Sequence, residues 1–409
     1  MQKVHIVGAG LGGMVAAICL AREGHEVLIL DAGSRIGGIR GYHPSIHVTP
    51  MDMEMMLSYA GIDLRPKLTA LDKFWRLGAW GDQYEFYSKT GMHLETKLLG
   101  VERGPRKTSL DTLLYDEARK LGVKFQFSTY IEDPKELPPR SIIATGLCPE
   151  MYETLDIPYE QVEGYYFVEK KKVRPEKDVI LYFGDFSSDY FYCISLNGIY
   201  YGFVFQREPM DYGKLLQFED LLEEHEGERH KWLPFMCRVP LKRFNQVRLF
   251  TGEHILSGSL TGMMDPVLMF GIQGALLSGR VAARAVTDPE AAMAEFRVLT
   301  HFYRHSWLTR KLVEAVPTIY RKYVYRFLRY DMGEFLKRYG AYTRPMLRLM
   351  DKGIPGYEWG YLAPNIPASE KEKDRVARFE RVVARACSRI PAARIPQAIR
   401  TLKTMGRLA

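Results

Sequence analysis

The chain has 409 residues, 46% of them hydrophobic, and a formal net charge of +8, which fits a globular protein with room for two or three packed units. Its five cysteines are far apart and show no CxxC spacing, which argues against a zinc site, an iron–sulfur cluster or a redox dithiol and favours a reducing cytosol; they are Cys19, Cys148, Cys193, Cys237 and Cys387. No metal site is expected. No secretory leader or spanning helix is expected either, because residues 1–3 lead straight into a strand and no run of roughly eighteen apolar residues occurs.

The first predicted elements form a strand, a glycine-rich turn, a helix and a second strand. Residues 4–7 predict a short buried strand, residues 14–23 an apolar helix, and residues 26–30 a second strand that ends at Asp31. This order and spacing are typical of a dinucleotide-binding unit, whereas a plain structural βαβ unit is the alternative.

The turn between the first strand and the helix has the pattern GxGxxG. Gly8 allows the tight turn, Gly10 lets a pyrophosphate approach the backbone, and Gly13 lets the helix pack close to the strand. The helix begins near Leu11, and its N–H groups and dipole attract phosphate. Asp31 stands where a carboxylate can accept hydrogen bonds from the ribose hydroxyls.

The loop after the second strand indicates which dinucleotide is bound. Asp31 is followed by Ala32 and, six and seven positions after the acid, by Gly37 and Gly38. This arrangement resembles the extended fingerprint of FAD-binding oxidoreductases, in which the glycine pair lets the chain pass close to the nucleotide. The alternative is an NAD-binding Rossmann domain whose loop happens to contain glycines.

Two further segments resemble flavoprotein patterns. Residues 111–127 predict an amphipathic helix followed by a strand, and a later apolar strand ends in Ala144, Thr145 and Gly146. In flavoproteins such a strand end lies near the FAD. Arg106, just before the helix, resembles an arginine that contacts the nucleotide, although it could equally be a surface residue.

The segment from residue 254 to residue 285 resembles the flavin-proximal part of the geranylgeranyl reductase and aromatic hydroxylase superfamily. There a strand ends in Gly-Asp, an Asp-Pro turn follows, and a long helix begins with small residues against the flavin. The resemblance covers roughly residues 1–290 in scattered motifs. The cofactor-binding residues that it implies in this segment are Ser259, Asp265, Gly271 and Ile272.

One departure from the superfamily pattern concerns Ser259. The superfamily has an aspartate at this position, which accepts a hydrogen bond from the ribityl chain. Serine can still form a hydrogen bond but carries no charge. Because of this departure, a further alternative is that the protein has a flavin-binding fold but a binding or assembly role without catalysis.

The middle of the chain predicts an antiparallel sheet packed over the flavin. Residues 179–183, 190–195 and 200–205 are short aromatic and β-branched runs, and Asn197-Gly198 between the last two is a strong hairpin signal. The expected fold class is α/β, with a Rossmann-like FAD-binding domain, an inserted antiparallel β-sheet substrate domain and a helical C-terminal region. The expected boundaries are 1–50, 95–150 and 250–290 for the FAD domain, 51–94 and 151–249 for the substrate domain, and 291–409 for the C-terminal region.

The candidate catalytic residues are two histidines and two tyrosines. His43 and His47 follow the glycine pair, in a region that lies near the flavin ring in related flavoproteins. Either could donate a proton to an alkene or bond covalently to FAD, and polar surface is the alternative. Tyr190 and Tyr192 loosely resemble the geranylgeranyl reductase motif Tyr-x-Trp-x-Phe-Pro, with tyrosine in place of tryptophan. The alternative is an ordinary hairpin with paired core aromatics.

The positive charge is concentrated in the C-terminal third. Residues 296–409 contain 24 Lys and Arg against 9 Asp and Glu, whereas the rest of the chain contains 33 against 40. Aromatic or aliphatic residues alternate with these cations, which favours an anionic membrane surface. An acidic partner protein or an oligomer contact is the alternative, and nucleic acid is not expected.

These observations favour an FAD-dependent reductase that saturates a carbon–carbon double bond of a hydrophobic isoprenoid or lipid substrate. A flavin monooxygenase or oxidase of a smaller aromatic substrate is the alternative enzyme. No second GxGxxG is visible, so the electron donor is expected to be NAD(P)H that docks transiently or an acidic ferredoxin-like carrier. The expected location is the cytoplasm, with peripheral contact at the inner face of the membrane.

Overall fold

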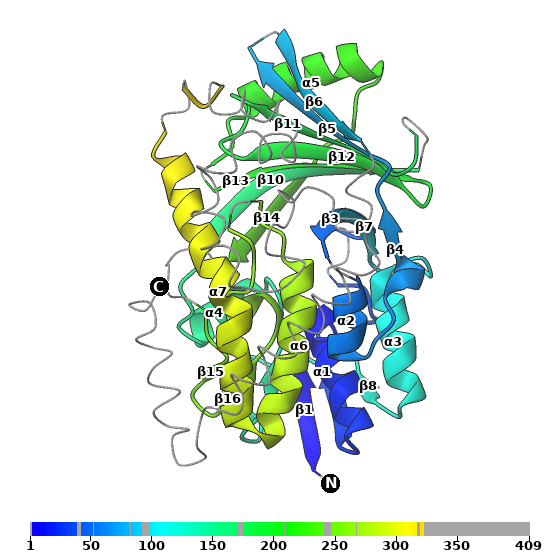
Figure 1. Ribbon diagram of the computed structural model, residues 1–409, viewed down its shortest axis with the longest axis vertical. Coiled ribbons are helices and arrows are strands. Elements are labelled where there is room, and N and C mark those ends of the chain that lie inside the picture. The colour runs from blue at the N-terminus through cyan, green and yellow to red at the C-terminus, as the bar shows by residue number, and fades with distance from the viewer. Residues whose placement is uncertain are drawn as a thin grey trace, which may run out of the picture.

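The computed structural model describes residues 2–38, 42–51, 53–81, 83–91, 98–170, 175–207, 209–240, 247–266, 268–316 and 320–322. Three sheets and the helices around them make up this part of the chain (Figure 1). The six-stranded sheet and its helices form the lower half of the view, and the seven-stranded sheet forms the upper half. Among the described residues, no helix is both long and apolar enough to cross a bilayer.

The six-stranded sheet carries the predicted βαβ unit. Its strand order is β15-β16-β9-β1-β2-β8, and its neighbouring strands are parallel except for the antiparallel pair β15–β16. The strands are β1 Lys3–Val7, β2 Glu26–Leu30, β8 Lys124–Gln126, β9 Ile142–Ile143, β15 Phe250–Thr251 and β16 His254–Leu256. Val4, Ile6, Val27 and Ile29 are buried, as the apolar runs predict.

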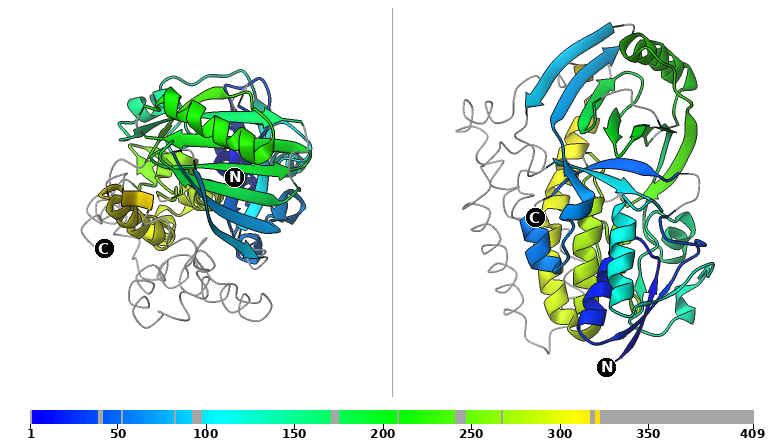
Figure 2. Two further views of the ribbon diagram at one scale, coloured as in Figure 1. Left: turned by 90° about the horizontal axis from the view of Figure 1, so that it is seen from above. Right: turned by 90° about the vertical axis from the view of Figure 1, so that its right-hand side faces the viewer.

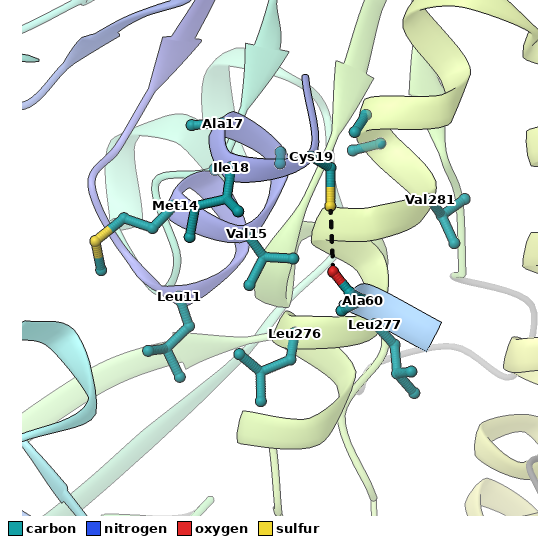
Figure 3. Close-up of a cluster of buried hydrophobic side chains, with 14 of the residues drawn as sticks. Leu11, Met14, Val15, Ala17, Ile18, Cys19, Ala60, Leu276, Leu277 and Val281 are labelled. Carbon is teal, nitrogen blue, oxygen red and sulfur yellow. Dashed lines mark hydrogen bonds between the residues drawn. The ribbon is translucent and has the colours of Figure 1, made fainter. Parts of the chain in front are cut away.

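Helices α1 (Leu11–Arg22) and α6 (Ile272–Thr287) pack closely on this sheet. A Cβ atom at Gly279 of α6 would lie 2.5 Å from the carbonyl oxygen of Gly12 in α1, so the missing side chain allows the close approach. Figure 3 shows the core between these helices and α2 (Met53–Ala60), where the thiol of Cys19 lies 4.0 Å from the carbonyl oxygen of Ala60. Helix α3 (Leu110–Lys120) confirms the predicted amphipathic helix and begins at a Ser109 cap.

The seven-stranded sheet has the order β14-β10-β13-β12-β11-β5-β6 and is antiparallel except for the parallel pair β5–β11. This parallel pair differs from the expected pattern, because β5 comes from a segment about a hundred residues earlier in the chain and joins the sheet through tertiary contacts. The strands are β5 Lys73–Trp80, β6 Gln83–Gly91, β10 Glu160–Glu169, β11 Asp178–Gly184, β12 Tyr190–Leu196, β13 Ile199–Gln206 and β14 Leu233–Val239.

The predicted hairpin is confirmed by strands β12 and β13. Asn197 and Gly198 at its turn have φ values of 53° and 71°, the left-handed conformation that a two-residue hairpin turn requires. Register pairing extends from Tyr190 opposite Phe205 to Leu196 opposite Ile199. The turn therefore fixes which side chains of the hairpin share a face.

The two faces of this sheet have different neighbours. Helix α5 (Tyr212–Glu226) covers the outer face and buries Phe218 and Leu222 against it, and Figure 2 shows it lying across the strands when seen from above. The inner face packs toward the Rossmann-like unit through Met264 and Phe270. A three-stranded sheet, with the order β3 (Ser45–Pro50), β7 (Leu98–Arg103) and β4 (Leu68–Ala70), lies between the two larger sheets (Figure 1).

The C-terminal helix of the described region, α7 (Pro289–Glu314), runs along α6 and reaches the ends of β10, β12 and β13. Arg310 forms a buried ion pair with Asp189, and Arg207 bridges Glu160 at 2.6 Å and Glu314 at 2.7 Å. The remaining short helices are η1 Arg65–Lys67, η2 Pro134–Glu136, α4 Pro149–Thr154 and η3 Gly258–Thr261. The basic residues beyond position 322 lie outside the described residues, and the domain boundaries stay predictions.

Candidate active site

Of the three GxGxxG glycines in the turn, only Gly10 has open space at the position of a Cβ atom. Gly8 has φ +104°, and a Cβ atom there would lie 2.4 Å from the carbonyl oxygen of Ala144. A Cβ atom at Gly13 would lie 2.1 Å from the carbonyl oxygen of Gly8, whereas at Gly10 the nearest atom would be 3.9 Å away. Gly8 and Gly13 are therefore required by packing within the chain. Gly10 instead borders open space at the start of α1, where no side chain of the described residues caps the helix, and this fits a pyrophosphate.

Asp31 is fixed at the edge of this turn. Its Oδ2 accepts a hydrogen bond from the backbone N–H of Ala9 at 2.6 Å, and its Oδ1 accepts one from Gly33 at 2.7 Å. Because a carboxylate has about four acceptor positions, both oxygens can still accept ribose hydroxyls. Ala32 and Gly38 are exposed, and Gly37 is buried against the loop that contains Pro105.

The carboxyl ends of β9 and β16 lie beside the glycine turn. Ala144 donates its N–H to the carbonyl oxygen of Val7 at 2.7 Å, and the hydroxyls of Thr145 and Ser257 are buried without a hydrogen-bond partner among the described residues. A Cβ atom at Gly12 would lie 2.5 Å from the Ser257 hydroxyl, so this end of β16 contacts α1 directly. Ligands of open α/β sheets bind at this edge, and the buried hydroxyls fit a polar ligand.

The loop before α6 connects this edge to the seven-stranded sheet. Ser259 lies half-buried in η3, and the buried Asp265 donates its N–H to the carbonyl oxygen of Phe270 at 2.9 Å. The hydroxyl of Tyr190 donates to the carbonyl oxygen of Leu268 at 2.5 Å. Gly146, at the end of the β9 segment, adopts φ +69°, and a Cβ atom there would meet no described atom within 4 Å. Gly271 and Ile272 form the start of α6.

Three of the four predicted catalytic residues form one hydrogen-bonded chain. Nδ1 of His43 lies 2.8 Å from Oγ of Ser45, and the same Oγ lies 2.8 Å from Nε2 of His47. Nδ1 of His47 lies 3.5 Å from the hydroxyl of Tyr192, which donates to the carbonyl oxygen of Ile46 at 3.0 Å. Ser45 was not among the residues predicted from the sequence. Its i, i+2 spacing from His47, which places both side chains on one face of a strand, was a signal that could have found it.

Both imidazoles are neutral at neutral pH. Burial and the nearby Arg103 guanidinium lower the pKa of His43 to about 4 and that of His47 to about 3. Arg103 itself forms a buried two-pronged ion pair with Asp111, at 2.8 and 2.9 Å. Proton transfer from either histidine must therefore start from a neutral N–H group.

Aromatic rings line the inner face of the seven-stranded sheet beside these hydrogen-bonded residues. The Tyr42 ring lies 5.1 Å from the ring of Tyr166 and 4.8 Å from that of Phe235, and its hydroxyl accepts from Tyr201 at 3.2 Å. Burial raises the pKa of Tyr192 and Tyr201 well above the usual value. These phenols therefore stay protonated and act as hydrogen-bonding groups on an apolar wall.

Arg106 contacts the hairpin in the described structure. Its Nη2 donates to the carbonyl oxygen of Asn197 at 2.9 Å, and its Nε lies 3.4 Å from the buried carboxylate of Glu102. A nucleotide contact for Arg106 stays a prediction. Within the described ranges, no group of three or more His, Cys, Asp or Glu side chains is placed to hold a metal ion.

Comparison with known proteins begins with the N-terminal segment. Residues 6–45 match the family model of the NAD(P)-binding Rossmann-like domain. A stretch of 53 residues, 13% of this chain, is 41% identical to a putative flavin-containing monooxygenase, FMO GS-OX-like 10, of Arabidopsis thaliana, and covers 12% of it. A stretch of 37 residues, 9% of this chain, is 60% identical to an L-amino-acid oxidase of Mus musculus and covers 6% of it. The matches thus span about a tenth of these relatives or less.

Solved structures share the fold over a longer range. A geranylgeranyl bacteriochlorophyll reductase-like protein from Thermoplasma acidophilum aligns over 100% of both chains, with TM-score 0.53 and 15% identity. CtdE, in complex with FAD and a substrate, aligns over 95% of this chain and 100% of its own, with TM-score 0.53 and 12% identity. A 2-methyl-3-hydroxypyridine-5-carboxylic acid oxygenase aligns over 75% and 90%, with TM-score 0.52 and 13% identity. The chain therefore has a Rossmann-like domain within the fold of FAD-dependent oxidoreductases, the fold that geranylgeranyl reductase-like proteins and aromatic hydroxylases share.

Proposed function

We propose that the protein binds FAD and is a reductase that saturates a carbon–carbon double bond of a hydrophobic isoprenoid or lipid substrate. The observation that carries this proposal is the apolar, aromatic inner face of the seven-stranded sheet, which closes over the carboxyl-end edge of the Rossmann-like sheet. Its cluster joins Tyr190, Tyr192 and Tyr201 of the sheet to Met264 and Phe270 of the loop before α6. An apolar substrate gains free energy by leaving water for such a wall.

Each part of the site has a role in this proposal. The open side of Gly10 and the carboxylate of Asp31 would hold the pyrophosphate and ribose, and the half-buried Ser259 would take the position next to the ribityl chain. When bound, FAD supplies the redox chemistry. His43 and His47, neutral and hydrogen-bonded through Ser45, would hold and pass a proton at the aromatic wall.

The proposal extends to partners. The electron donor is NAD(P)H or an acidic ferredoxin-like carrier, and the basic residues 296–409 bind an anionic membrane surface where a lipid substrate is available. Most of that basic segment lies outside the described residues, so its support is the charge pattern of the sequence. The proposed location is peripheral, at the inner face of the membrane.

A flavin monooxygenase or oxidase of an aromatic substrate is the second candidate. It is supported by the N-terminal similarity to flavin-containing monooxygenases and by an oxygenase among the proteins of similar fold. A flavin-fold binding or assembly protein is the third, and it is supported by the uncharged Ser259 at the position of the superfamily aspartate.

One set of spectra separates the three candidates. The purified protein is expected to show the absorption bands of bound oxidised flavin, which a binding protein without cofactor would lack. After anaerobic reduction, a reductase is expected to reoxidise slowly in air and to transfer two hydrogen atoms to an isoprenoid lipid, detected by mass spectrometry. Fast reoxidation with insertion of oxygen into an aromatic compound would overturn the reductase proposal in favour of a monooxygenase.

A further inference from the structure

We propose that His43, Ser45 and His47 form a directional proton relay that takes up a proton at Nε2 of His43 and delivers one at the hydroxyl of Tyr192. The relay rests on the proposed function, in which the inner aromatic face holds the substrate. Its two ends lie in different places. His43 lies against Gly38 of the dinucleotide loop, and Tyr192 belongs to the wall of the seven-stranded sheet.

The backbone places Ser45 and His47 on one face of β3, which pairs with β7 from Ser45 onward. His43 precedes the strand, across the cis His43–Pro44 peptide, and reaches Ser45 through its side chain. Ser45 is fully buried, and both of its histidine contacts are 2.8 Å, within the range of strong hydrogen bonds. A single hydroxyl therefore joins the two imidazoles.

The direction of the hydrogen bonds follows from counting protons. The single proton of the Tyr192 hydroxyl is donated to the carbonyl oxygen of Ile46, so this oxygen can only accept from His47. His47 then carries its proton on Nδ1 and a lone pair on Nε2, which obliges Ser45 to donate to it. Ser45 in turn accepts a hydrogen bond from Nδ1–H of His43. Nε2 of His43 is then unprotonated and carries the lone pair at this end of the relay.

The accepting nitrogen faces the dinucleotide loop. A Cβ atom at Gly38 would lie only 2.7 Å from Nε2 of His43, so the glycine makes room for the imidazole edge. His43 and His47 are both half-buried, which leaves each partly accessible to a small molecule. No hydrogen bond from another described residue occupies Nε2 of His43.

Burial, and after it the surrounding charges, keep the relay neutral. Arg103 disfavours a second proton on either imidazole, and Asp111, which favours one, is neutralised by its two hydrogen bonds from Arg103. A proton therefore moves by exchange of tautomers and is not stored as an imidazolium ion. The phenolate of Tyr192 is also disfavoured in this buried position, so its proton leaves as His47 supplies another.

The proton balance suits saturation of a double bond. Tyr192 would give its hydroxyl proton to one carbon, and FAD held at Gly10 and Asp31 would, once reduced, supply the hydride for the other. The Tyr192 oxygen takes the Nδ1 proton of His47. Nε2 of His47 then takes the hydroxyl proton of Ser45, and the Ser45 oxygen takes the Nδ1 proton of His43. One proton from solvent then binds Nε2 of His43, so one proton enters for each proton delivered. Both histidines are then Nε2–H and exchange back to Nδ1–H before the next proton is delivered.

The experiment measures the tautomers directly in the full-length protein labelled with ¹⁵N-histidine. Long-range ¹H–¹⁵N spectra are expected to show His43 and His47 both protonated on Nδ1. In Tyr192→Phe the acceptor for His47 is lost, and since an unconstrained imidazole favours Nε2–H, both histidines are expected to switch to Nε2–H. A switch at His43, three links from the substitution, is a result that a purely local structural role of Tyr192 would not produce.

Variants of the linking residue complete the test. Ser45→Ala is expected to switch His43 to Nε2–H and leave His47 on Nδ1–H, whereas Ser45→Thr keeps the hydroxyl and both wild-type tautomers. Ser195→Ala, the same change at a buried serine that is not part of the relay, is the matched control. The relay is overturned if wild-type His43 carries Nε2–H, or if Tyr192→Phe leaves His43 unchanged. Flavin absorbance of the same samples tests the proposed function separately, because the tautomers need neither flavin nor substrate.

Discussion

The guanidinium of Arg106 donates from Nη2 to the backbone carbonyl oxygen of Asn197 over 2.9 Å. Asn197 forms the turn of the β12–β13 hairpin, and Arg106 lies in the loop between β7 and α3, so this hydrogen bond joins that loop to the seven-stranded sheet. Glu102 completes the contact, because its buried carboxylate accepts from Nδ2 of Asn197 at 2.8 Å and lies 3.4 Å from Nε of Arg106.

Replacing Arg106 with alanine is therefore expected to destabilise the protein by about 1–3 kcal/mol, because the buried Glu102 loses its counter-charge. The free energy of unfolding in urea measures the loss. The neighbouring exposed Lys107→Ala is the matched control and is expected to change little. If Arg106→Ala keeps wild-type stability but loses FAD affinity, the arginine acts on the nucleotide and not on the hairpin.

Gly10→Val is expected to abolish FAD binding without unfolding the protein. Gly10 has φ −80° and ψ −178°, an extended conformation open to any residue, and its Cβ position meets no atom closer than 3.9 Å. The valine side chain therefore fits the folded chain but occupies the space of the pyrophosphate. Flavin absorbance and thermal unfolding check the two halves of the prediction. Gly213→Val on α5 is the control, and full flavin occupancy in Gly10→Val would place the nucleotide elsewhere.

Ser259→Asp is expected to keep or tighten FAD binding. Ser259 stands half-buried at the position of the superfamily aspartate, and a carboxylate there adds a charged acceptor for the ribityl hydroxyls. Flavin titration followed by fluorescence measures the dissociation constant. The same change at the exposed Ser58 of α2 is expected to leave the constant unchanged. A large loss of affinity in Ser259→Asp, but not in Ser58→Asp, would show that Ser259 does not take the place of the superfamily aspartate.

His230 is expected to make stability depend on pH. Burial by itself would lower its pKa, but hydrogen bonds to Glu169 and Glu226 outweigh burial and raise the pKa to about 8. Since the folded-state pKa lies above the unfolded value of about 6.5, the stabilisation is complete below pH 6.5 and is lost as the pH rises through about 8.

The expected difference in unfolding free energy between roughly pH 6 and pH 9 is on the order of 1–2 kcal/mol from this group. Urea titrations at the two pH values measure it. His230→Gln is expected to remove this difference while it lowers stability at the lower pH. An equal pH dependence in the variant and the wild type would assign the effect to other groups.

Removal of residues 389–409 is expected to weaken binding to acidic vesicles while flavin binding persists, because the cofactor motifs end near residue 285. Each Lys or Arg near an anionic surface contributes about 1 kcal/mol, and salt screens the attraction over roughly 8 Å at physiological ionic strength. Co-sedimentation with acidic and neutral vesicles at several salt concentrations measures it. If the full-length protein does not bind acidic vesicles, and truncation lowers its size in light scattering, the segment forms an oligomer contact instead.

Local patterns in the sequence were enough to predict the βαβ unit and the β12–β13 hairpin. The second strand was predicted at residues 26–30 and is observed as Glu26–Leu30, and the Asn197-Gly198 turn adopts the expected positive φ values. These features are encoded by neighbours in the chain, because apolar periodicity and glycine conformations act over a few residues. The resemblance to FAD-binding oxidoreductases rests on the same short motifs.

Other features depended on contacts between distant segments. The parallel pairing of β5 with β11, the contact of Arg106 with Asn197, and the cover of α5 over the outer face all join residues far apart in sequence. His43 and His47 were visible as candidates, but their neutrality was not, because it follows from their burial beside Arg103 in the folded chain. The sequence by itself determined which local units form. Only the tertiary structure decided their mutual burial and charge environment, since both depend on which distant side chains exclude water from one another.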